Sequence, residues 1–453
     1  MNSIIRSLRH RNFRLYFFGQ GLSVTGTWMQ SVAVGWLVYD LTGSKVLLGV
    51  AGFASQIMTF VVAPFAGVLA ERWNRRRTIL AAQVLAMAQA LALAAIAFTL
   101  PEEQVDSWVP IWPILALCIF TGLVRGFEVP TRQSFIVQML EDPSDLPNAI
   151  ALNSFLVNSA RLIGPLIAGG IIWAAEEYGE SEQGETAYGA GLVFLINGVS
   201  YAAIIAALVA MRIAPRHREP VGNVLAGLKE GVVYAWRTPT IRTVLVLLAL
   251  SSLVAIPYSN LLPAFAKDAH LLDGGPDTLG YLRGATGVGA LIAGALLAYR
   301  REAVPLRRIL LGAAVLFGLG LIAFALLARY RSSLWLALPV LVWVGLAMTA
   351  QMYACNTLLQ TTSDEDKRGR VMSLYTMAFM GVIPFGAILT GWLAEVLDAT
   401  LAGFGPSYEG LGAPVVVAAG GVILTVGTLL LGRRLPKGIR PSPATMEGIQ
   451  GAE

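Results

Sequence analysis

The chain has 453 residues, of which 56% are hydrophobic and only 13% charged, and its formal net charge is +5. Soluble globular domains carry roughly 25% charged residues, so this composition excludes an ordinary soluble protein. The basic excess does not indicate nucleic acid binding, because Lys and Arg cluster in short segments between long apolar runs.

Residue types that bind metals or phosphates are sparse. Cys118 and Cys355 both fall inside apolar runs, so no disulfide framework is implied. His10, His217 and His270 are scattered and lack metal-ligand spacing, and no phosphate-binding Gly-rich loop is found. We therefore expect no metal, no cofactor and no ATPase activity, so any work would draw on a gradient or a partner.

Long apolar runs follow one another from end to end. The first one follows Arg6, Arg9, Arg11 and Arg14, and it is too long for a signal-peptide core and lacks a small-residue cleavage site. Runs of about 20 apolar residues each predict a membrane-spanning helix. Twelve spans are expected at residues 13–40, 44–70, 78–100, 111–137, 149–175, 190–212, 240–265, 277–299, 306–329, 333–359, 370–397 and 412–432. The sequence thus predicts an all-α membrane protein with twelve transmembrane helices.

The charge distribution predicts the orientation. Most Lys and Arg lie in the terminal segments and in the loops that share their side of the membrane, whereas the opposite loops are acidic, especially Glu176 to Glu185. Cytoplasmic loops carry such a basic excess. We expect a multi-pass protein of a bacterial-type cell membrane (the inner membrane where there are two), with both termini cytoplasmic.

A faint internal repeat divides the chain. Residues 5–15 match 233–243, and residues 122–135 match 345–358, in the same order. Two halves that enter from the same side form a parallel repeat. We predict six-helix bundles at 1–212 and 240–435, a linker at 213–239 and a disordered tail at 436–453. Within the linker, one face of a short amphipathic helix suits lipid headgroups; it comprises Leu225, Leu228, Val232 and Trp236.

The turn between the second and third spans is acidic and then basic. A charge in hydrocarbon costs ~3 kcal/mol, so this turn lies at the membrane surface. It resembles the signature loop of the major facilitator superfamily, on the positions Gly67, Glu71, Arg72, Arg75 and Arg76. Asn74 stands where the family has Gly, and Asn also tolerates a left-handed turn. The resemblance implies a cytoplasmic gating latch; a plain basic turn is the alternative.

The fourth span carries three charges on one helix face: Arg125, Glu128 and Arg132. Ionisable groups inside a membrane are expensive and suggest function. In one interpretation Glu128 carries a proton, while Arg125 tunes its pKa or holds an anionic substrate group. In the other, the three form a static salt-bridge ladder.

In the fifth span, Asn158 and Arg161 precede Gly164-Pro165, and Pro inside a helix removes a hydrogen bond and kinks it. The stretch resembles the Gly-Pro antiporter motif of exporters in the same superfamily. Three residues, rather than the usual two, separate Pro165 from Gly169-Gly170. The resemblance implies export; a simple packing kink is the alternative.

Residues 25–44, the basic loop and the fourth and fifth spans together are similar to the enterobactin-exporter branch of the superfamily, which includes siderophore and drug exporters. In that family the first, fourth, seventh and tenth spans line a central cavity. Polar or aromatic candidates there are Trp28, Gln30, Tyr258, Asn260, Gln351, Tyr353 and Asn356. Single polar residues in helical bundles more often serve as interhelical hydrogen bonds.

The resemblance implies a secondary transporter that exports amphipathic small molecules by proton antiport and alternating access. Its partners would be a small organic substrate, protons and membrane lipid, with no nucleic acid, and we expect a monomer. An uncoupled facilitator or lysophospholipid flippase of the same fold is the alternative. A membrane enzyme would need paired catalytic groups such as His with Asp, which the sequence does not offer, and a channel would not show slow, saturable flux.

Overall fold

The computed structural model describes residues 3–72, 74–100, 111–178, 185–213, 224–299, 306–328, 334–365, 367–405 and 408–435. Within these ranges every regular element is helical. The predicted tail at 436–453 and the first part of the predicted linker, residues 214–223, lie outside the described residues.

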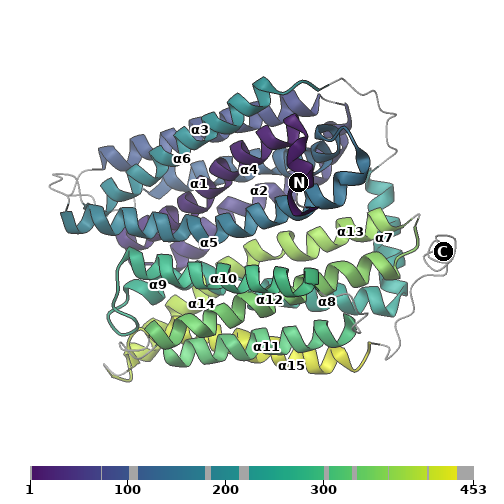
Figure 1. Cartoon of the computed structure of the whole chain (residues 1–453). Helices are drawn as coiled ribbons and strands as arrows, with labels where there is room; N and C mark the ends of the chain where they lie inside the picture. Colours follow the sequence, from purple (N-terminus) through teal and green to yellow (C-terminus); the bar gives the residue numbers. More distant parts are fainter. Residues whose placement is uncertain are drawn as a thin grey trace.

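Six long helices form the first half of the molecule (Figure 1). They are α1 (Arg11–Thr42), α2 (Lys45–Arg72), α3 (Arg75–Thr99), α4 (Ile111–Phe135), α5 (Leu146–Tyr178) and α6 (Glu185–Ala210). Three short 3₁₀ turns accompany them: η1 (Ser3–Arg9), η3 (Ile136–Met139) and η4 (Pro143–Asp145). In this half α1 packs on α5 and α6, and α4 packs on α2 and α3.

The second half repeats this arrangement with two of its spans divided. Its helices are α8 (Pro239–Val254), α9 (Tyr258–Lys267), α10 (Pro276–Tyr299), α11 (Leu306–Leu327), α12 (Leu334–Thr362), α13 (Arg368–Thr376), α14 (Ile383–Ala402) and α15 (Gly412–Gly432). The π-helical segment η6 (Met377–Gly381) joins α13 to α14. Figure 1 shows the two halves side by side, in contact mainly through α5 with α10 and α2 with α14.

Apolar composition explains most of these helices. In the described part of the chain, 11 segments are helical, long and apolar enough to cross a membrane. The remaining predicted span, 13–40, corresponds to α1, whose 32 residues are long enough to cross a membrane. Its average hydropathy is lower because it buries polar side chains such as Gln20, Ser23 and Gln30 against neighbouring helices.

Two predicted spans are not continuous, which corrects the expectation for 240–265 and 370–397. The first breaks between α8 and α9, where residues 255–257 form a turn and Pro257 supplies no amide donor. The Ala255 and Ile256 amides both donate to the Ser251 carbonyl. The second contains η6 and then Pro384. Such π segments often mark functional sites.

The helix predicted in the linker is α7 (Val224–Arg237), which packs on α13. Glu230 pairs with Arg370 at 2.5 Å, and the described side chains Val232 and Trp236 are 49% and 65% exposed. Exposed apolar and aromatic side chains suit a membrane interface. The side chains of Leu225 and Leu228 lie outside the described residues.

Candidate functional site

Helices α5 and α10 meet through glycines at the junction of the two halves. A Cβ on Gly169 would lie 2.5 Å from the Pro276 carbonyl oxygen, and one on Gly280 would lie 2.8 Å from the Pro165 carbonyl oxygen. Only glycine permits so close an approach of two helix backbones. A Cβ on Gly170 would meet nothing within 4 Å, so Gly169 alone of that pair makes the contact.

Pro165 lies within a helix that stays continuous, and the residue before it packs on α1. A Cβ on Gly164 would lie 2.7 Å from the Trp28 Cβ and 2.9 Å from the Thr25 carbonyl oxygen. The Gly-Pro pair is therefore held between α1 on one side and α10 on the other. This geometry accounts for its packing role, and the antiporter role implied by resemblance stays a prediction.

Arg161 lies one turn before this pair and faces α1. Its guanidinium carbon is 5.1 Å from the centroid of the Trp28 ring, within range of a cation–π contact. The side chain is half-buried, and its Nε atom is closed off from solvent without a hydrogen-bond partner. Asn158 donates instead to the Ser154 carbonyl of its own helix, at 2.9 Å.

A second arginine, Arg283 of α10, approaches the same face of α1 and was not predicted. Its guanidinium donates to the Ser31 hydroxyl at 3.2 Å and to the Ser259 carbonyl at 3.3 Å, and its Nε has no partner. A charged residue inside an apolar span is by itself a sign of function. That signal was present in the eighth span and could have identified Arg283.

Several residues that were predicted to line the cavity instead form hydrogen bonds with other helices of their own half. The Gln30 amide donates to Gln89 at 3.1 Å and accepts from Asn197 at 2.7 Å, so it joins α1 to α3 and α6. The Gln351 amide donates to the Ser251 hydroxyl at 2.5 Å, which joins α12 to α8. Gln30 and Gln351 therefore form hydrogen bonds between helices, which was the alternative role expected from the sequence for such polar residues.

The other candidates lie nearer the junction. Tyr258 begins α9, is buried and meets Phe317 edge-on, and its side chain is within electrostatic range of both Arg161 and Arg283. Asn260 lies against Gly52 of α2, and so contacts the other half. Asn356 accepts from Gln360 of the same helix at 2.6 Å, and Tyr353 is 44% exposed.

Glu128 of α4 is 14% exposed and lies in a polar group confined to the first half. It pairs with Arg132 at 3.2 Å and accepts from the Gln83 amide at 3.3 Å, and Gln83 in turn accepts from Ser23 at 3.5 Å. The structure thus brings Glu128 to Arg132, while it shows no ion pair with Arg125 among the described side chains. Proton carriage and a static pair both fit this arrangement.

The predicted gating loop is described only in part. The surroundings of Gly67 and the side chains of Glu71 and Arg72 are outside what the structure describes. Asn74 caps α3 by accepting from the Arg77 amide at 3.2 Å. Its φ of −68° shows that it does not use the left-handed conformation that the sequence comparison allowed.

Two basic residues of this loop have described side chains, Arg75 and Arg76. Arg75 is buried. Arg76 donates to the Leu208 and Val209 carbonyls at 2.7 and 2.8 Å. These belong to the last turn of α6, where carbonyls lack intrahelical partners and cations are favoured. Arg76 therefore ties α3 to α6 inside the first half.

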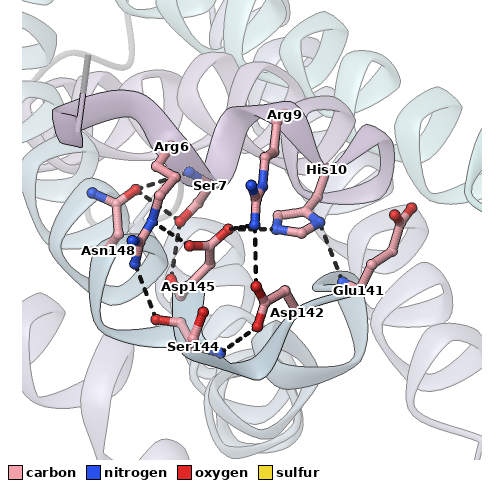
Figure 2. A network of polar contacts seen from close by, with 9 residues as sticks. All are labelled: Arg6, Ser7, Arg9, His10, Glu141, Asp142, Ser144, Asp145 and Asn148. Atoms are coloured by element: carbon pink, nitrogen blue, oxygen red, sulfur yellow. Dashed lines mark hydrogen bonds and ion pairs between the residues drawn. The ribbon is translucent and has the colours of Figure 1, made fainter. Parts of the chain in front are cut away.

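A polar network ties the start of the chain to the α4–α5 connection (Figure 2). Asp145 is fully buried, forms ion pairs with Arg6 and Arg9, and accepts from His10 Nε2 at 2.8 Å. His10 Nδ1 accepts from the Glu141 amide, which leaves the ring proton on Nε2 for Asp145. Arg9 also reaches Asp142, at 3.2 Å.

The two carboxyls of this network have lowered pKa values. Desolvation raises the pKa of Asp145, but the His10 hydrogen bond and the Arg6 and Arg9 charges outweigh it, so the pKa lies below its usual value. Hydrogen bonds from the Ser144 amide and hydroxyl lower the pKa of Asp142. Both carboxyls are thus held ionised, and the network is fully formed at neutral pH.

Ion pairs join the two halves at the opposite end of the bundle, where α1 ends. Lys45 pairs with Asp398 and lies 3.6 Å from Asp268, and Lys267 pairs with Asp40. Nearby, the Ser44 hydroxyl and the Val46 amide donate to Glu395 at 2.8 and 2.9 Å. This end of the junction is closed in the structure, and these contacts, between residues far apart in sequence, were not predicted.

The described residues include no candidate metal site, and a groove on the surface of the first half does not coincide with the residues above. In the described part of the chain, no cluster of three or more His, Cys, Asp and Glu residues could hold a metal ion. A groove between α3 and α4 is mainly apolar and is lined by Arg77, Leu85 and Phe127 among others. None of the predicted substrate residues lines it, so we place the candidate site at the α1–α5–α10 junction.

Comparison with known proteins gives consistent matches. A family model described as transmembrane secretion effector matches residues 2–422. The staphyloferrin A transporter of Staphylococcus aureus is 22% identical over 382 residues, 84% of this chain and 89% of that protein. The multidrug efflux pump Tap of Mycolicibacterium fortuitum is 24% identical over 413 residues, 89% and 93% of the two chains.

Solved structures share the fold. A bacterial homologue of the human lysosomal transporter Spinster, in an inward-facing and occupied conformation, superposes with a TM-score of 0.70 at 15% identity. The match covers 96% of this chain and 99% of that one. At this identity the likeness shows the arrangement of helices and nothing about the substrate.

Proposed function

The chain belongs to the transmembrane secretion effector family of major facilitator transporters, and from this premise we propose that it exports amphipathic small molecules by proton antiport. The predicted all-helical major facilitator fold is confirmed, and the chain is a membrane transporter and not an enzyme. Substrates of siderophore or drug type are supported by the names of its relatives, a siderophore transporter and a multidrug efflux pump.

The observation that carries the proton-coupled mechanism is the partly buried Glu128. Its carboxylate is stabilised by Arg132 and by the Gln83 amide, and it lies within a span where an unpaired charge is costly. Protonation would neutralise Glu128 and weaken its pairing with Arg132. Substrate and proton would then favour different conformations of α4, which links the flow of one to the flow of the other.

The ion pairs at one end of the bundle support an alternating-access cycle. With the basic segments placed in the cytoplasm, the Lys45 and Lys267 pairs lie on the outer side. In this proposal the cycle includes a state that is closed to the outside and held by these pairs. Opening would break these pairs as the two halves rock about the α5–α10 contact, and the basic loop at Arg72 to Arg76 would latch the cytoplasmic side.

Accumulation measurements in cells test this proposal. A panel of a catechol siderophore, cationic dyes, anionic dyes and a lysophospholipid is compared with and without the protein, each with and without a protonophore. We expect at least one compound to fall in expressing cells and the difference to vanish with the protonophore. An effect that survives the protonophore would instead support an uncoupled facilitator or a lysophospholipid flippase, and Glu128 would be a structural ion pair.

A further inference from the structure

We infer that the α1–α5–α10 junction is a binding site for an amphipathic organic anion, with two oxyanion groups held by Arg161 and Arg283 beside the Trp28 ring. This inference rests on the proposed transport function and names the charge class of the substrate. It separates anionic substrates from the cationic compounds that many efflux pumps carry.

The first argument is a charge imbalance. Three other cations at helix junctions in the described part of the chain face carboxylates: Arg132 faces Glu128, Lys45 faces Asp398 and Lys267 faces Asp40. Arg161 and Arg283 form no ion pair with any described residue. Two half-buried guanidinium groups without a counter-ion are costly in a membrane protein unless a ligand supplies the charge.

The second argument is unused hydrogen-bonding capacity. A guanidinium has five donors, and Arg161 makes no hydrogen bond with any described residue. Arg283 makes two long ones, to Ser31 and Ser259. Both Nε atoms lack a partner. Arginine forks of this kind bind carboxylate and phosphate oxygens with paired hydrogen bonds.

The third argument is the spacing of the two groups. Both arginines approach one face of α1, Arg161 at Trp28 and Arg283 at Ser31, one helical turn apart. Leu162 faces Gly287 and Leu166 faces Gly284 across the α5–α10 contact. Arg161 therefore lies opposite about position 288 of α10, five residues from Arg283. The two arginine backbones are thus ~7 Å apart along the helix axis. One small molecule with two anionic groups spans this distance.

The aromatic neighbours explain why the anion would be amphipathic. The Trp28 ring lies beneath Arg161 and is itself half-buried, and Tyr258 lies within electrostatic range of both arginines. Aromatic faces pack against flat apolar ligands, while the guanidinium groups take the oxyanions. Arg161 comes from the first half and Arg283 from the second, so a bound anion would contact both halves at once.

Two dyes with one scaffold and opposite charge test the inference. Carboxyfluorescein is anionic and rhodamine 123 is cationic, and both are built on a xanthene ring. Binding of each to the purified full chain in nanodiscs is measured by fluorescence anisotropy. We expect carboxyfluorescein to bind at least tenfold more tightly, with Arg161→Gln and Arg283→Gln each weakening it about tenfold through loss of charged hydrogen bonds.

The controls separate charge from folding. Arg161→Lys and Arg283→Lys keep the charge and should retain more binding than the Gln variants. Arg11→Gln removes an exposed arginine that donates to the Ala210 carbonyl, away from the junction, and should leave binding unchanged. Competition with tricarballylate and with lysophosphatidylglycerol then identifies whether a soluble polycarboxylate or a lipid headgroup is the better anion. Displacement by either supports the site.

Three outcomes would overturn the inference: rhodamine 123 binding as tightly as carboxyfluorescein, binding of carboxyfluorescein unaffected by both Gln variants, or no binding of carboxyfluorescein at millimolar concentration. Failure here is distinct from failure of the proposed function. Protonophore-sensitive export of rhodamine 123 alone would keep proton-driven export and refute the anion site. Arginine-dependent binding of carboxyfluorescein without proton-dependent flux would support the anion site and refute proton-driven export.

Discussion

At the scale of single residues, Asp145 shows how buried charge is accommodated at the start of the chain. It has no exposed surface and is surrounded by Arg6, Arg9 and His10 (Figure 2). A carboxyl whose pKa is lowered in the folded protein adds stability above its unfolded pKa and loses that contribution as the pH falls through the folded value. Because the usual value is 3.8, the contribution is complete at neutral pH and declines only in acid below about that value.

We therefore expect Asp145→Asn to lower the thermal unfolding midpoint by a few degrees at neutral pH, since Arg6 loses its paired carboxylate and Arg9 is left with Asp142. Unfolding of the purified protein in detergent is followed across pH. The difference between the unfolding midpoints of the variant and the wild type should become smaller at pH values below the usual pKa of an aspartate carboxyl. Asp142→Asn is the matched control, because that side chain is 47% exposed and, among the described residues, forms an ion pair with Arg9 alone. An equal effect of both variants would contradict the role assigned to Asp145.

Residue-scale prediction from sequence succeeded where partners are close in the chain. Arg132 follows Glu128 by four residues, and the helical spacing alone placed them together. Arg283 and Ser31 are 252 residues apart, and no local pattern specifies which helices will meet. For the same reason the sequence named Gln30 and Gln351 as polar but could not tell that each is satisfied inside its own half.

At the scale of helices, the contact between α5 and α10 depends on glycine. The Gly169 position faces the Pro276 carbonyl, while Gly170 faces open space. We expect Gly169→Ala to destabilise the protein or its closed state by about 1–3 kcal/mol, because the added methyl forces the backbones apart. Gly170→Ala should be close to neutral.

The measurement is the thermal unfolding midpoint together with the transport rate of the two variants in the same membrane. The two positions are neighbours in one helix, so the comparison controls for helix propensity, which alanine improves equally at both. Equal tolerance of both substitutions would show that the α5–α10 distance adjusts freely, and the packing account of the Gly-Pro stretch would be wrong.

Helix positions were well predicted because long apolar runs specify spans directly. Predicted spans such as 111–137 and 412–432 agree with α4 (Ile111–Phe135) and α15 (Gly412–Gly432) to within two residues. The breaks within 240–265 and 370–397 were missed, although Pro257 and Pro384 lie at them. A proline can lie inside an apolar run without ending the helix, as Pro165 does, so the residue type alone could not decide.

At the scale of the whole molecule, the ion pairs of Lys45 and Lys267 hold one end of the junction closed. We expect Asp398→Asn to favour opening of that end, because Lys45 would lose its main partner. Spin labels at Tyr178→Cys and Phe404→Cys, both exposed at this end on opposite halves, report the distance between the halves by pulsed electron resonance. The distribution should shift to longer distances.

Glu409→Gln is the control for this measurement, since Glu409 pairs with His270 inside the second half and does not cross the junction. It should leave the distance distribution unchanged. If Asp398→Asn also leaves it unchanged, the ion pairs do not hold the closed state, and helix packing through Gly49, Gly169 and Gly391 is sufficient.

The measurement that tests the central claim most directly is gradient-driven transport in proteoliposomes, using a compound that the cell panel shows to be extruded. Wild-type protein should accumulate it against its gradient when a pH difference is imposed, and protons should flow in the opposite direction. Glu128→Gln should still exchange substrate for substrate but should lose accumulation, whereas Glu177→Gln, at an exposed carboxylate, should behave as wild type. Uphill accumulation by correctly folded Glu128→Gln would contradict the account.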